Sequence, residues 1–426
     1  MIHAKLTGLW RSPDFLKLWA GQTVSVFGSI VGGFALSLVA VLLLDVTPTQ
    51  MSILRVAELG PVIVLGLFAG VWVDRLRRRN VMIVADLGRA LALATIPAAA
   101  LLGILGAGQV YAVAVATSAL GLFFDVAYPS YLPSLVERDR LLEGNSKLQA
   151  SNSIAEVSGF GLAGLLVQAL TAPITILVDA ISFLVSALTL SLIRKPEPPH
   201  HEAGETSAWT DIVEGLRLVR GDRTLRSLAT VEGIRSFFGH GFFGTLIVIY
   251  CARDLGLSPG TMGVLFSLGG ISAFFGALLA EPLTRRWGVR STLLRTYLFS
   301  AVVSLGIVLA GGSPILTLVC LAVPQLLGDG ADVVFDISRT SLLQTITPDR
   351  LLGRMNATMR FVGMTAMLAG SLVGGALGEA FGTRPTLLVA VIGTCLGALW
   401  LARLPKVVGG NSTRVEARRA PKLVVE

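Results

Sequence analysis

The feature that most constrains this chain is a series of twelve apolar stretches, each long enough to cross a lipid bilayer as a helix. A crossing needs about 20 mainly apolar residues, because backbone polar groups in the hydrocarbon region must be hydrogen-bonded within the protein. Of the 426 residues, 53% are hydrophobic and 15% are charged, whereas soluble domains carry roughly 25% charged residues. We therefore predict an all-α polytopic membrane protein with spans at 15–44, 51–73, 81–102, 108–132, 149–170, 173–193, 227–250, 260–280, 291–311, 314–337, 356–379 and 384–403.

Lysine and arginine residues gather in every second connection between these stretches. Short cytoplasmic connections retain positive charge, so this alternation indicates the side that each connection faces. The odd-numbered connections, counted from the N-terminal tail, each hold three or more basic residues, while the connections between them hold only Arg253 and Arg384. Both termini are therefore predicted to be cytoplasmic. The net charge of +8 then reflects topology, and we expect no binding of nucleic acid.

The longest polar stretch divides the spans six and six. It begins at Arg194 and Lys195, and its second part carries apolar residues at helical spacing, which predicts a short helix at the membrane interface: Trp209, Ile212, Val213, Leu216 and Val219. We predict an N-terminal six-helix bundle over 1–193, a cytoplasmic linker over 194–226, a C-terminal six-helix bundle over 227–403 and a cytoplasmic tail over 404–426.

The two halves also repeat in sequence. Phe124 and Asp125 recur as Phe335 and Asp336, and the run from Thr175 to Val178 recurs as Thr386 to Val389, at an offset of 211 residues. Chance similarity between apolar segments does not explain matches at charged and polar positions. Two pseudo-symmetric bundles are the architecture expected of a transporter whose halves rock about a central site.

Signals for enzymatic or metal chemistry are weak in this sequence. It has no H-E-x-x-H motif and no G-x-x-x-x-G-K-[S/T] phosphate loop, so direct use of ATP is not expected. Cys251, Cys320 and Cys395 lie in or beside apolar stretches, without C-x-x-C spacing or neighbouring histidines. We predict that the protein is not an enzyme and holds no metal or organic cofactor.

The connection after the second stretch runs from Gly70 to Arg79 and reads G-V-W-V-D-R-L-R-R-R. It resembles the signature G-x-x-x-D-R-x-G-R-R/K of the major facilitator superfamily, with Arg77 at the position of the second glycine. A weaker copy runs from Ala277 to Arg286. Three further stretches resemble the exporter branch that includes macrolide efflux pumps and the enterobactin exporter: Leu16 to Gln22, Ala85 to Ala90 and Tyr131 to Val136.

This resemblance implies a secondary transporter in the bacterial cytoplasmic (inner) membrane that exports an amphipathic small molecule, such as a drug, macrolide or siderophore. It implies proton antiport with alternating access, a monomer, and a cavity lined by the first, fourth, seventh and tenth spans. The sequence departs from the proton-antiport branch at two points. Phe160 stands where a proline is common, and the fourth span has no arginine. The expected partners are a small-molecule substrate, protons and the lipid bilayer.

Ionised side chains inside a span cost about 2.5 to 3.5 kcal/mol, so each needs a partner or a water-filled path. Carboxylates outnumber arginines in the set that we consider: Glu58, Asp86, Arg89, Asp125, Glu156, Asp179, Glu232, Arg235, Asp329, Asp332 and Arg360. Glu232 and Arg235 are three residues apart and can pair on one helix face, as can Asp86 and Arg89. Such pairs can also serve packing alone.

Glu156 and Asp179 have no opposite charge within one helical turn. A carboxyl group enclosed in an apolar cavity binds a proton more readily, which is the property that a proton carrier needs. We therefore predict that Glu156, Asp179 or Glu232 carries the coupling proton, with Arg235 as the partner of Glu232. The predicted substrate contacts are Gln22, Gln325, Asp329 and Asp332.

Asp125 and Asp336 occupy matched positions in the two halves. We predict that they form charge pairs that close an inner gate in one conformation and break in the other, together with Asp74, Arg75, Arg78 and Arg79. The alternative is that these charges only cap helix ends and set topology.

Two other functions fit the same fold. An importer or facilitator of a polar solute would carry more hydrogen-bonding side chains in the spans that line the cavity. A receptor or scaffold that transports nothing would not need unpaired carboxylates inside its spans.

Overall fold

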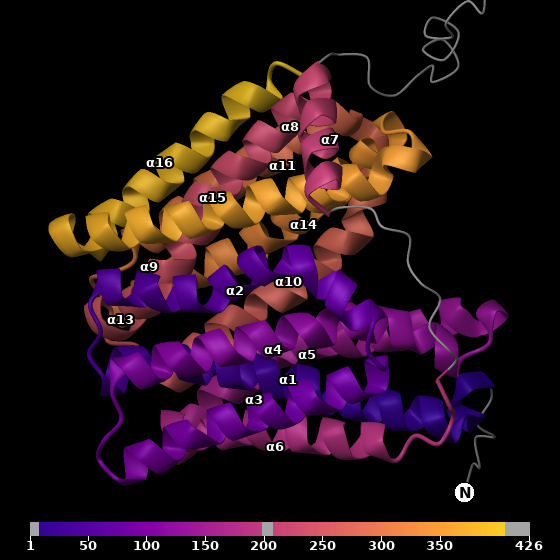
Figure 1. Cartoon of the computed structure of the whole chain (residues 1–426). Coiled ribbons are helices and arrows are strands. Elements are labelled where there is room, and N and C mark those ends of the chain that lie inside the picture. Colours follow the sequence, from indigo (N-terminus) through magenta and orange to yellow (C-terminus); the bar gives the residue numbers. More distant parts are fainter. Residues whose placement is uncertain (1–7, 198–207, 405–426) are drawn as a thin grey trace, which may run out of the picture.

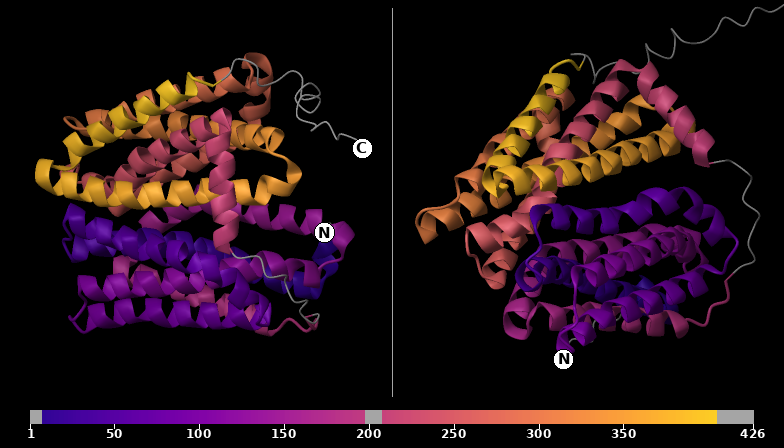
Figure 2. Two further views of the ribbon diagram at one scale, coloured as in Figure 1. Left: turned by 45° about the horizontal axis from the view of Figure 1, so that its top comes forward. Right: turned by 60° about the vertical axis from the view of Figure 1, so that its left-hand side comes forward.

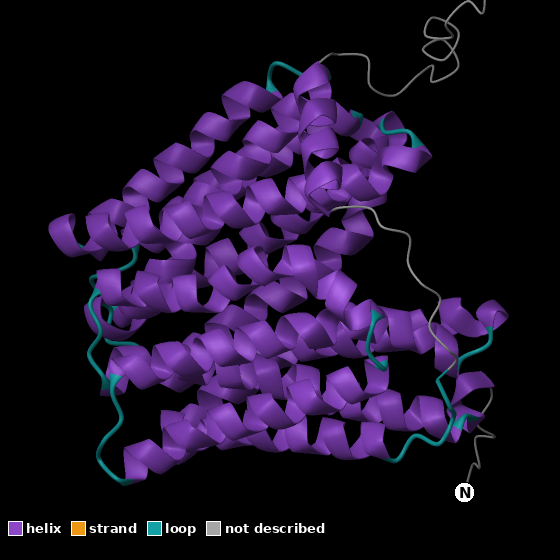
Figure 3. Cartoon of the chain, viewed as in Figure 1, coloured by secondary structure: helices purple, strands orange, loops and turns teal. Residues whose placement is uncertain are grey.

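The computed structural model describes residues 8–197 and 208–404, without the side chains of residues 67, 71, 74 and 208–214. Over these ranges the chain consists of helices and short connections, with no strand (Figure 3). Eleven helical rods in the described parts are long and apolar enough to cross a membrane. Helix α2, 27 residues long, covers the remaining predicted span. The prediction of an all-α polytopic membrane fold is confirmed.

The first six crossings are nearly continuous helices. They are α1 (Pro13–Leu38) with a π-helical segment at Val39–Leu43, α2 (Pro48–Asp74), α3 (Arg78–Leu101), α4 (Ala107–Leu135), α5 (Leu141–Leu170) and α6 (Ala172–Ser191). Helix α7 (Ala208–Gly221) follows as a short connecting helix.

The last six crossings include three that are interrupted. The seventh comprises α8 (Arg223–Ile234), a π-helical segment at Arg235–Phe243, α9 (Gly244–Ile249) and a second π-helical segment at Tyr250–Asp254. The eighth is α10 (Pro259–Trp287), and the ninth is α11 (Val289–Val303) with α12 (Leu305–Leu309). The tenth joins α13 (Pro314–Val323) to α14 (Asp329–Ile346) through a π-helical segment at Pro324–Gly328, and α15 (Leu352–Phe381) and α16 (Thr383–Leu401) complete the set.

Several helices run beyond the predicted span limits. Helix α10 continues to Trp287, so Arg285 and Arg286 lie on the helix and not in a connection. The helix ends where Gly288 adopts a φ of 76°, which favours glycine. Apolar composition marks only the part of a helix that lies in hydrocarbon, which is why the sequence placed the end too early.

Helix starts follow from local sequence. Thr47 and Gln50 form a capping box at the start of α2, with Pro48 in the first turn. The turn before α6 and the turn before α16 match across the repeat: Thr171 has a φ of 78° and Gly382 a φ of 90°. Both turns are followed by a threonine, Thr175 or Thr386, whose hydroxyl donates back to the turn carbonyl. The two halves therefore share backbone detail as well as sequence.

Helices α1 to α6 form one half of the molecule and α8 to α16 the other, as Figures 1 and 2 show. We call the end with the connections at 44–47, 102–106, 255–258 and 310–313 the distal end, and the opposite end, where the described chain begins and stops, the terminal end. Helix α7 packs closely against α15. The contact is so close that a β-carbon at Gly215 would overlap the side chain of Thr358. The side chains of Trp209, Ile212 and Val213 lie outside the described residues.

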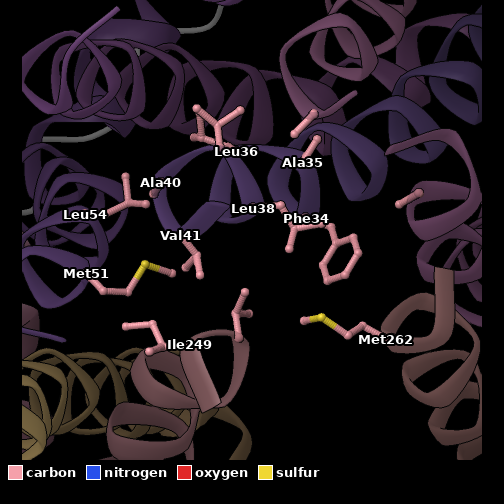
Figure 4. Packing of buried hydrophobic residues seen from close by; sticks show 14 of the residues in the cluster. Phe34, Ala35, Leu36, Leu38, Ala40, Val41, Met51, Leu54, Ile249 and Met262 are labelled. Carbon is pink, nitrogen blue, oxygen red and sulfur yellow. The ribbon is translucent and has the colours of Figure 1, made fainter. Parts of the chain in front are cut away.

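The buried apolar residues are arranged differently at the two ends. At the distal end one cluster joins both halves, and Figure 4 shows Val41, Met51 and Ile249 packed together within it. At the terminal end there are two separate clusters, one around Phe15 and Tyr131 and the other built from residues of the second half. Within the described residues, the halves thus share a core at the distal end and have separate cores at the terminal end.

Close helix contacts between the halves depend on glycine. A β-carbon at Gly263 of α10 would overlap backbone atoms of α5, including the Cα of Gly164 at 2.8 Å. A β-carbon at Gly375 of α15 would lie 2.7 Å from the carbonyl oxygen of Pro48 and from the side chain of Ser52 on α2. Small residues allow this approach in membrane helices. These two contacts hold the halves together near the distal end.

Candidate functional site

A cavity of about 1110 Å³ lies between the two halves. Helices α1, α2 and α5 line it from the first half, and all six crossings of the second half contribute residues. Drug-sized ligands occupy pockets of about 300 to 1,000 Å³, so the cavity has room for a small organic molecule. Its position at the boundary between the halves is the place expected for the substrate site of a rocking transporter.

Three aromatic rings form one wall of the cavity. Phe34 of α1, Phe160 of α5 and Phe266 of α10 contact one another edge to face, with ring centroids 5.9 to 6.1 Å apart. Two of these rings come from the first half and one from the second. The wall therefore offers an apolar surface that belongs to both halves at once.

Carboxylates line the same cavity from both halves. Glu156 of α5 is exposed to the cavity, and Asp329 and Asp332 enter it from the tenth crossing. Gln325 lies beside Asp329, and both approach Gly269 of α10, where a β-carbon would overlap the Asp329 carboxylate. The hydroxyl of Ser300 on α11 lies near Asp332 in the same cavity. Within the described parts of the chain, neither Glu156 nor Asp329 forms an ion pair.

Other charges around the cavity are paired. Arg55 of α2 donates to Glu58 at 2.8 Å and to the carbonyl oxygen of Gly244. Arg235 donates to Asp336 at 2.7 Å. The cavity lining thus holds more carboxylates than arginines, and the carboxylates outside these pairs are Glu156, Asp329 and Asp332.

The predicted pair of Glu232 and Arg235 belongs to a larger network. Their closest charged atoms are 3.9 Å apart, whereas Arg339 lies 2.8 Å from Glu232 and 3.5 Å from Asp336. The π-helical segment at Arg235–Phe243 places Arg235, Gly239, His240 and Phe243 along the cavity. Spacing along the sequence could not give the contacts of Arg235 with α14, because they depend on how two helices pack.

Three of the predicted proton-coupling and substrate residues are not part of the cavity lining: Gln22, Asp179 and Glu232. Gln22 sits on α1 with its side-chain oxygen buried and without a hydrogen-bond partner among the described residues. Asp179 of α6 is 5% exposed and is enclosed between α6, α1 and α3. In contrast, Glu156, Arg235, Gln325, Asp329, Asp332 and Asp336 all line the cavity.

The predicted gate residues Arg78 and Arg79 form hydrogen bonds within their own half. Arg78 donates to the carbonyl oxygen of Ser130 at 3.2 Å, and Arg79 donates to the carbonyl oxygens of Leu190 and Ser191. Basic side chains at carbonyl ends of helices are stabilising, which matches the capping alternative. Asp125 is exposed and within electrostatic range of Arg89 and of Arg360 on α15.

Arg75 is exposed at the terminal end, and the side chain of Asp74 lies outside the described residues. Arg79 has a counterpart in the second half, because Arg290, 211 residues later, donates to the carbonyl oxygen of Ala402. Pairing of Arg75, Arg78 or Arg79 with Asp125 or Asp336 stays a prediction for the other conformation.

Polar contacts between the halves gather at the distal end. Arg253 of the seventh crossing pairs with Asp45 at 2.7 Å and donates to the carbonyl oxygens of Val41 and Val46. Glu379 of α15 accepts hydrogen bonds from Thr47 and Thr49 at the start of α2. Together with the shared core, these contacts close the cavity at the distal end.

One further sequence pattern is explained by the structure. Gly256 to Gly260 has the spacing G-x-S-x-G that marks a nucleophilic serine in some hydrolases. Ser258 is instead the N-cap of α10, and its hydroxyl accepts a hydrogen bond from the backbone of Thr261. The pattern therefore marks the start of a membrane helix. A catalytic serine of this kind would instead lie on a sharp turn between a strand and a helix.

Comparison with known proteins agrees with this architecture. The family model of the Major Facilitator Superfamily matches residues 18–362 and 236–425. The chain is 28% identical over 415 residues to the multidrug efflux pump Tap of Mycolicibacterium fortuitum, covering 94% of this chain and 98% of the relative. It is 26% identical to the uncharacterized MFS-type transporter YfiS of Bacillus subtilis (strain 168), with 88% and 89% covered.

Among solved structures, a bacterial homologue of the iron transporter ferroportin in an inward-facing state superposes with a TM-score of 0.76. The identity is 18%, with 93% of this chain and 99% of that chain covered, so the likeness concerns the fold. The resemblance of the sequence to exporters is confirmed by the efflux-pump relatives. With the signature after α2, the twelve helices in two halves and the cavity between them, the chain belongs to the major facilitator superfamily of membrane transporters.

Proposed function

We propose that this protein exports amphipathic small molecules that carry a positive charge, by proton antiport with alternating access. The observation that carries the proposal is the cavity between the halves, which is lined both by three phenylalanine rings and by carboxylates that form no ion pair among the described residues. An apolar wall binds the hydrophobic part of a cargo, and aromatic faces and carboxylates both attract a cation. The efflux-pump relatives support the outward direction of transport.

Proton coupling follows from competition in the same cavity. A carboxylate that binds a cationic cargo when ionised releases it when protonated, so cargo and proton exclude each other. Glu156 and Asp329 suit this role because they lie in the cavity on opposite halves. Glu232 and Arg235 then act through their network with Asp336 and Arg339, which rearranges when the charge of any member changes.

The proposed setting is the bacterial cytoplasmic membrane, with both termini and the terminal end on the cytoplasmic side. In this orientation the distal contacts close the outer side, and cargo enters from the cytoplasm. We further propose that one chain suffices for transport, because the cavity is enclosed by helices of a single chain.

The test is an assay in proteoliposomes with an acidic interior. Transporters whose terminal end faces outward should accumulate a permanently charged lipophilic cation, and a protonophore should abolish the accumulation. A quaternary ammonium dye avoids trapping of weak bases by acid, and protein-free liposomes give the background. Macrolides, siderophores and polar nutrients complete the panel.

Gradient-independent equilibration of a polar nutrient, without movement of any cation, would favour the facilitator. Absence of flux for every member of the panel would contradict transport of these cargo classes.

A further inference from the structure

The first half contains a buried charged cluster that the cavity does not use. It consists of Asp86 and Arg89 on α3 and Asp179 on α6. Their exposed fractions are 0%, 8% and 5%. Asp86 forms an ion pair with Arg89, and Asp179 lies within electrostatic range of both. Two carboxylates and one guanidinium therefore lie close together in a buried region.

Among the described residues, Arg89 is the one cation near the two carboxylates of the cluster. The Arg89 guanidinium lies over the rings of Phe124 and Phe183, at 4.7 and 4.0 Å. The neighbouring polar groups are the hydroxyl of Ser182, which donates to Asp179 at 3.2 Å, and the hydroxyl of Ser186, which lies near Asp86. From α4, Asp125 adds a further negative charge near Arg89. One oxygen of Asp86 has no hydrogen-bond partner among the described residues.

Charge counting then requires a proton. An uncompensated ion in an apolar interior costs several kcal/mol even after relaxation, and such groups neutralise instead. Two interacting carboxylates take up that proton as a pair. The cluster is neutral with one proton bound and carries a net negative charge without it.

Helix α1 connects this cluster with the cavity. On one face, a β-carbon at Gly28 or Gly32 would overlap Ser182 or the Asp179 carboxylate, so α1 lies directly on these groups. On its other face, Ser29, Gly33 and Phe34 line the cavity. A change in charge or hydrogen bonding at Asp179 therefore acts on the helix that forms the cavity wall.

We propose that Asp179, with Asp86 and Arg89, forms a proton-binding site of the transport cycle; this proposal rests on the proposed function. The site lies on the side of α1 that faces away from the cargo cavity. Proton uptake there changes the packing of α1 on α6 and thereby the cavity. The position has no equivalent in the second half, where Ala390 replaces it. The site thus makes the two halves chemically unequal.

The test compares Asp179→Asn and Asp86→Asn with Asp139→Asn, a matched change at an exposed residue of the terminal end. Either cluster variant leaves one carboxylate for Arg89, so the cluster is neutral without a proton. Both variants should lose accumulation driven by the pH gradient and keep exchange of labelled for unlabelled cargo, which moves no net protons. Asp139→Asn should keep both activities.

An infrared titration provides a readout that does not depend on transport. The wild-type protein should show a carboxylic acid band at neutral pH that Asp179→Asn or Asp86→Asn removes. Full gradient-driven accumulation in both variants would overturn the proposal, as would a wild-type spectrum without a protonated carboxyl group. If the wild-type protein itself does not use the gradient, the proposed antiport is wrong, while the infrared band still reports whether the cluster binds a proton.

Discussion

Individual carboxylates in this protein differ in what surrounds them. Glu58 and Asp336 each have a guanidinium within ion-pair distance. Asp329 and Glu156 face the cavity and have no ion-pair partner among the described residues. A partner fixes the charge of a carboxylate, whereas a carboxylate in a cavity is free to bind cargo or a proton. The carboxylates in the cavity are therefore the ones that we expect to contact the cargo.

Replacing Asp329 with asparagine tests this expectation. The variant keeps the shape of the side chain and removes a charge that no described residue neutralises. We expect roughly tenfold weaker binding of a lipophilic cation, measured by titration of purified protein. A neutral amphiphile of similar size should bind as it does to the wild-type protein. Equal loss for both ligands would mean that Asp329 shapes the cavity and does not recognise charge.

A second prediction at the level of residues compares how much the ion pair of Arg253 and its hydrogen bonds to carbonyl oxygens each stabilise the distal end. Asp45 is 88% exposed, so Asp45→Asn should change the free energy of unfolding by no more than about 1 kcal/mol. Arg253→Ala also deprives the carbonyl oxygens of Val41 and Val46 of a donor, at a cost of about 1 to 3 kcal/mol. Thermal unfolding in detergent measures both. A larger effect for Asp45→Asn would contradict this assignment.

At the scale of elements, the contact of α5 with α10 is the tightest link that we can test. A β-carbon at Gly263 meets backbone atoms, which cannot move aside as a side chain would. Gly263→Ala should therefore cost about 1 to 3 kcal/mol of stability, as overpacking usually does. Gly66→Ala on α2 is the matched control, because no atom lies within 4 Å of its added carbon. An unchanged melting temperature for Gly263→Ala would show that the helices adjust.

The elements were predictable from sequence to the extent that apolar composition defines them. All twelve spans correspond to helices, because an apolar stretch in a bilayer must satisfy its backbone internally. The π-helical segments at Arg235–Phe243 and Pro324–Gly328 were not predicted, since no residue pattern marks an extra residue per turn. The segment at Arg235–Phe243 matters for the site because it brings Arg235 and His240 to the cavity.

Placement of site residues was predictable only in part. Glu156, Asp329 and Asp332 could be selected as charges inside spans, and they line the cavity. Asp179 met the same criterion but lies behind α1, because the rotation of a helix within a bundle depends on its neighbours. Phe34 and Phe266 gave no signal, since an aromatic residue in a membrane helix is usually packing. Phe160, which replaces an expected proline, was the one hint of the aromatic wall.

At the scale of the whole molecule, the arrangement of the cores describes one conformation. A shared core and polar contacts join the halves at the distal end, while the terminal end has a separate core in each half. Alternating access requires a second conformation in which the terminal end closes and the distal end opens. The glycine contacts and the exposed pair of Arg253 and Asp45 are the features that must separate.

The most direct test of alternating access measures distances across both ends of the same molecule. Spin labels at Leu142 and Arg285 span the terminal end, and labels at Leu102 and Ile315 span the distal end; these four positions are exposed. The three native cysteines are first replaced by alanine. We predict that a change in pH or the addition of cargo shortens the first distance and lengthens the second. Two distances that stay constant, or that change in the same direction, would contradict alternating access.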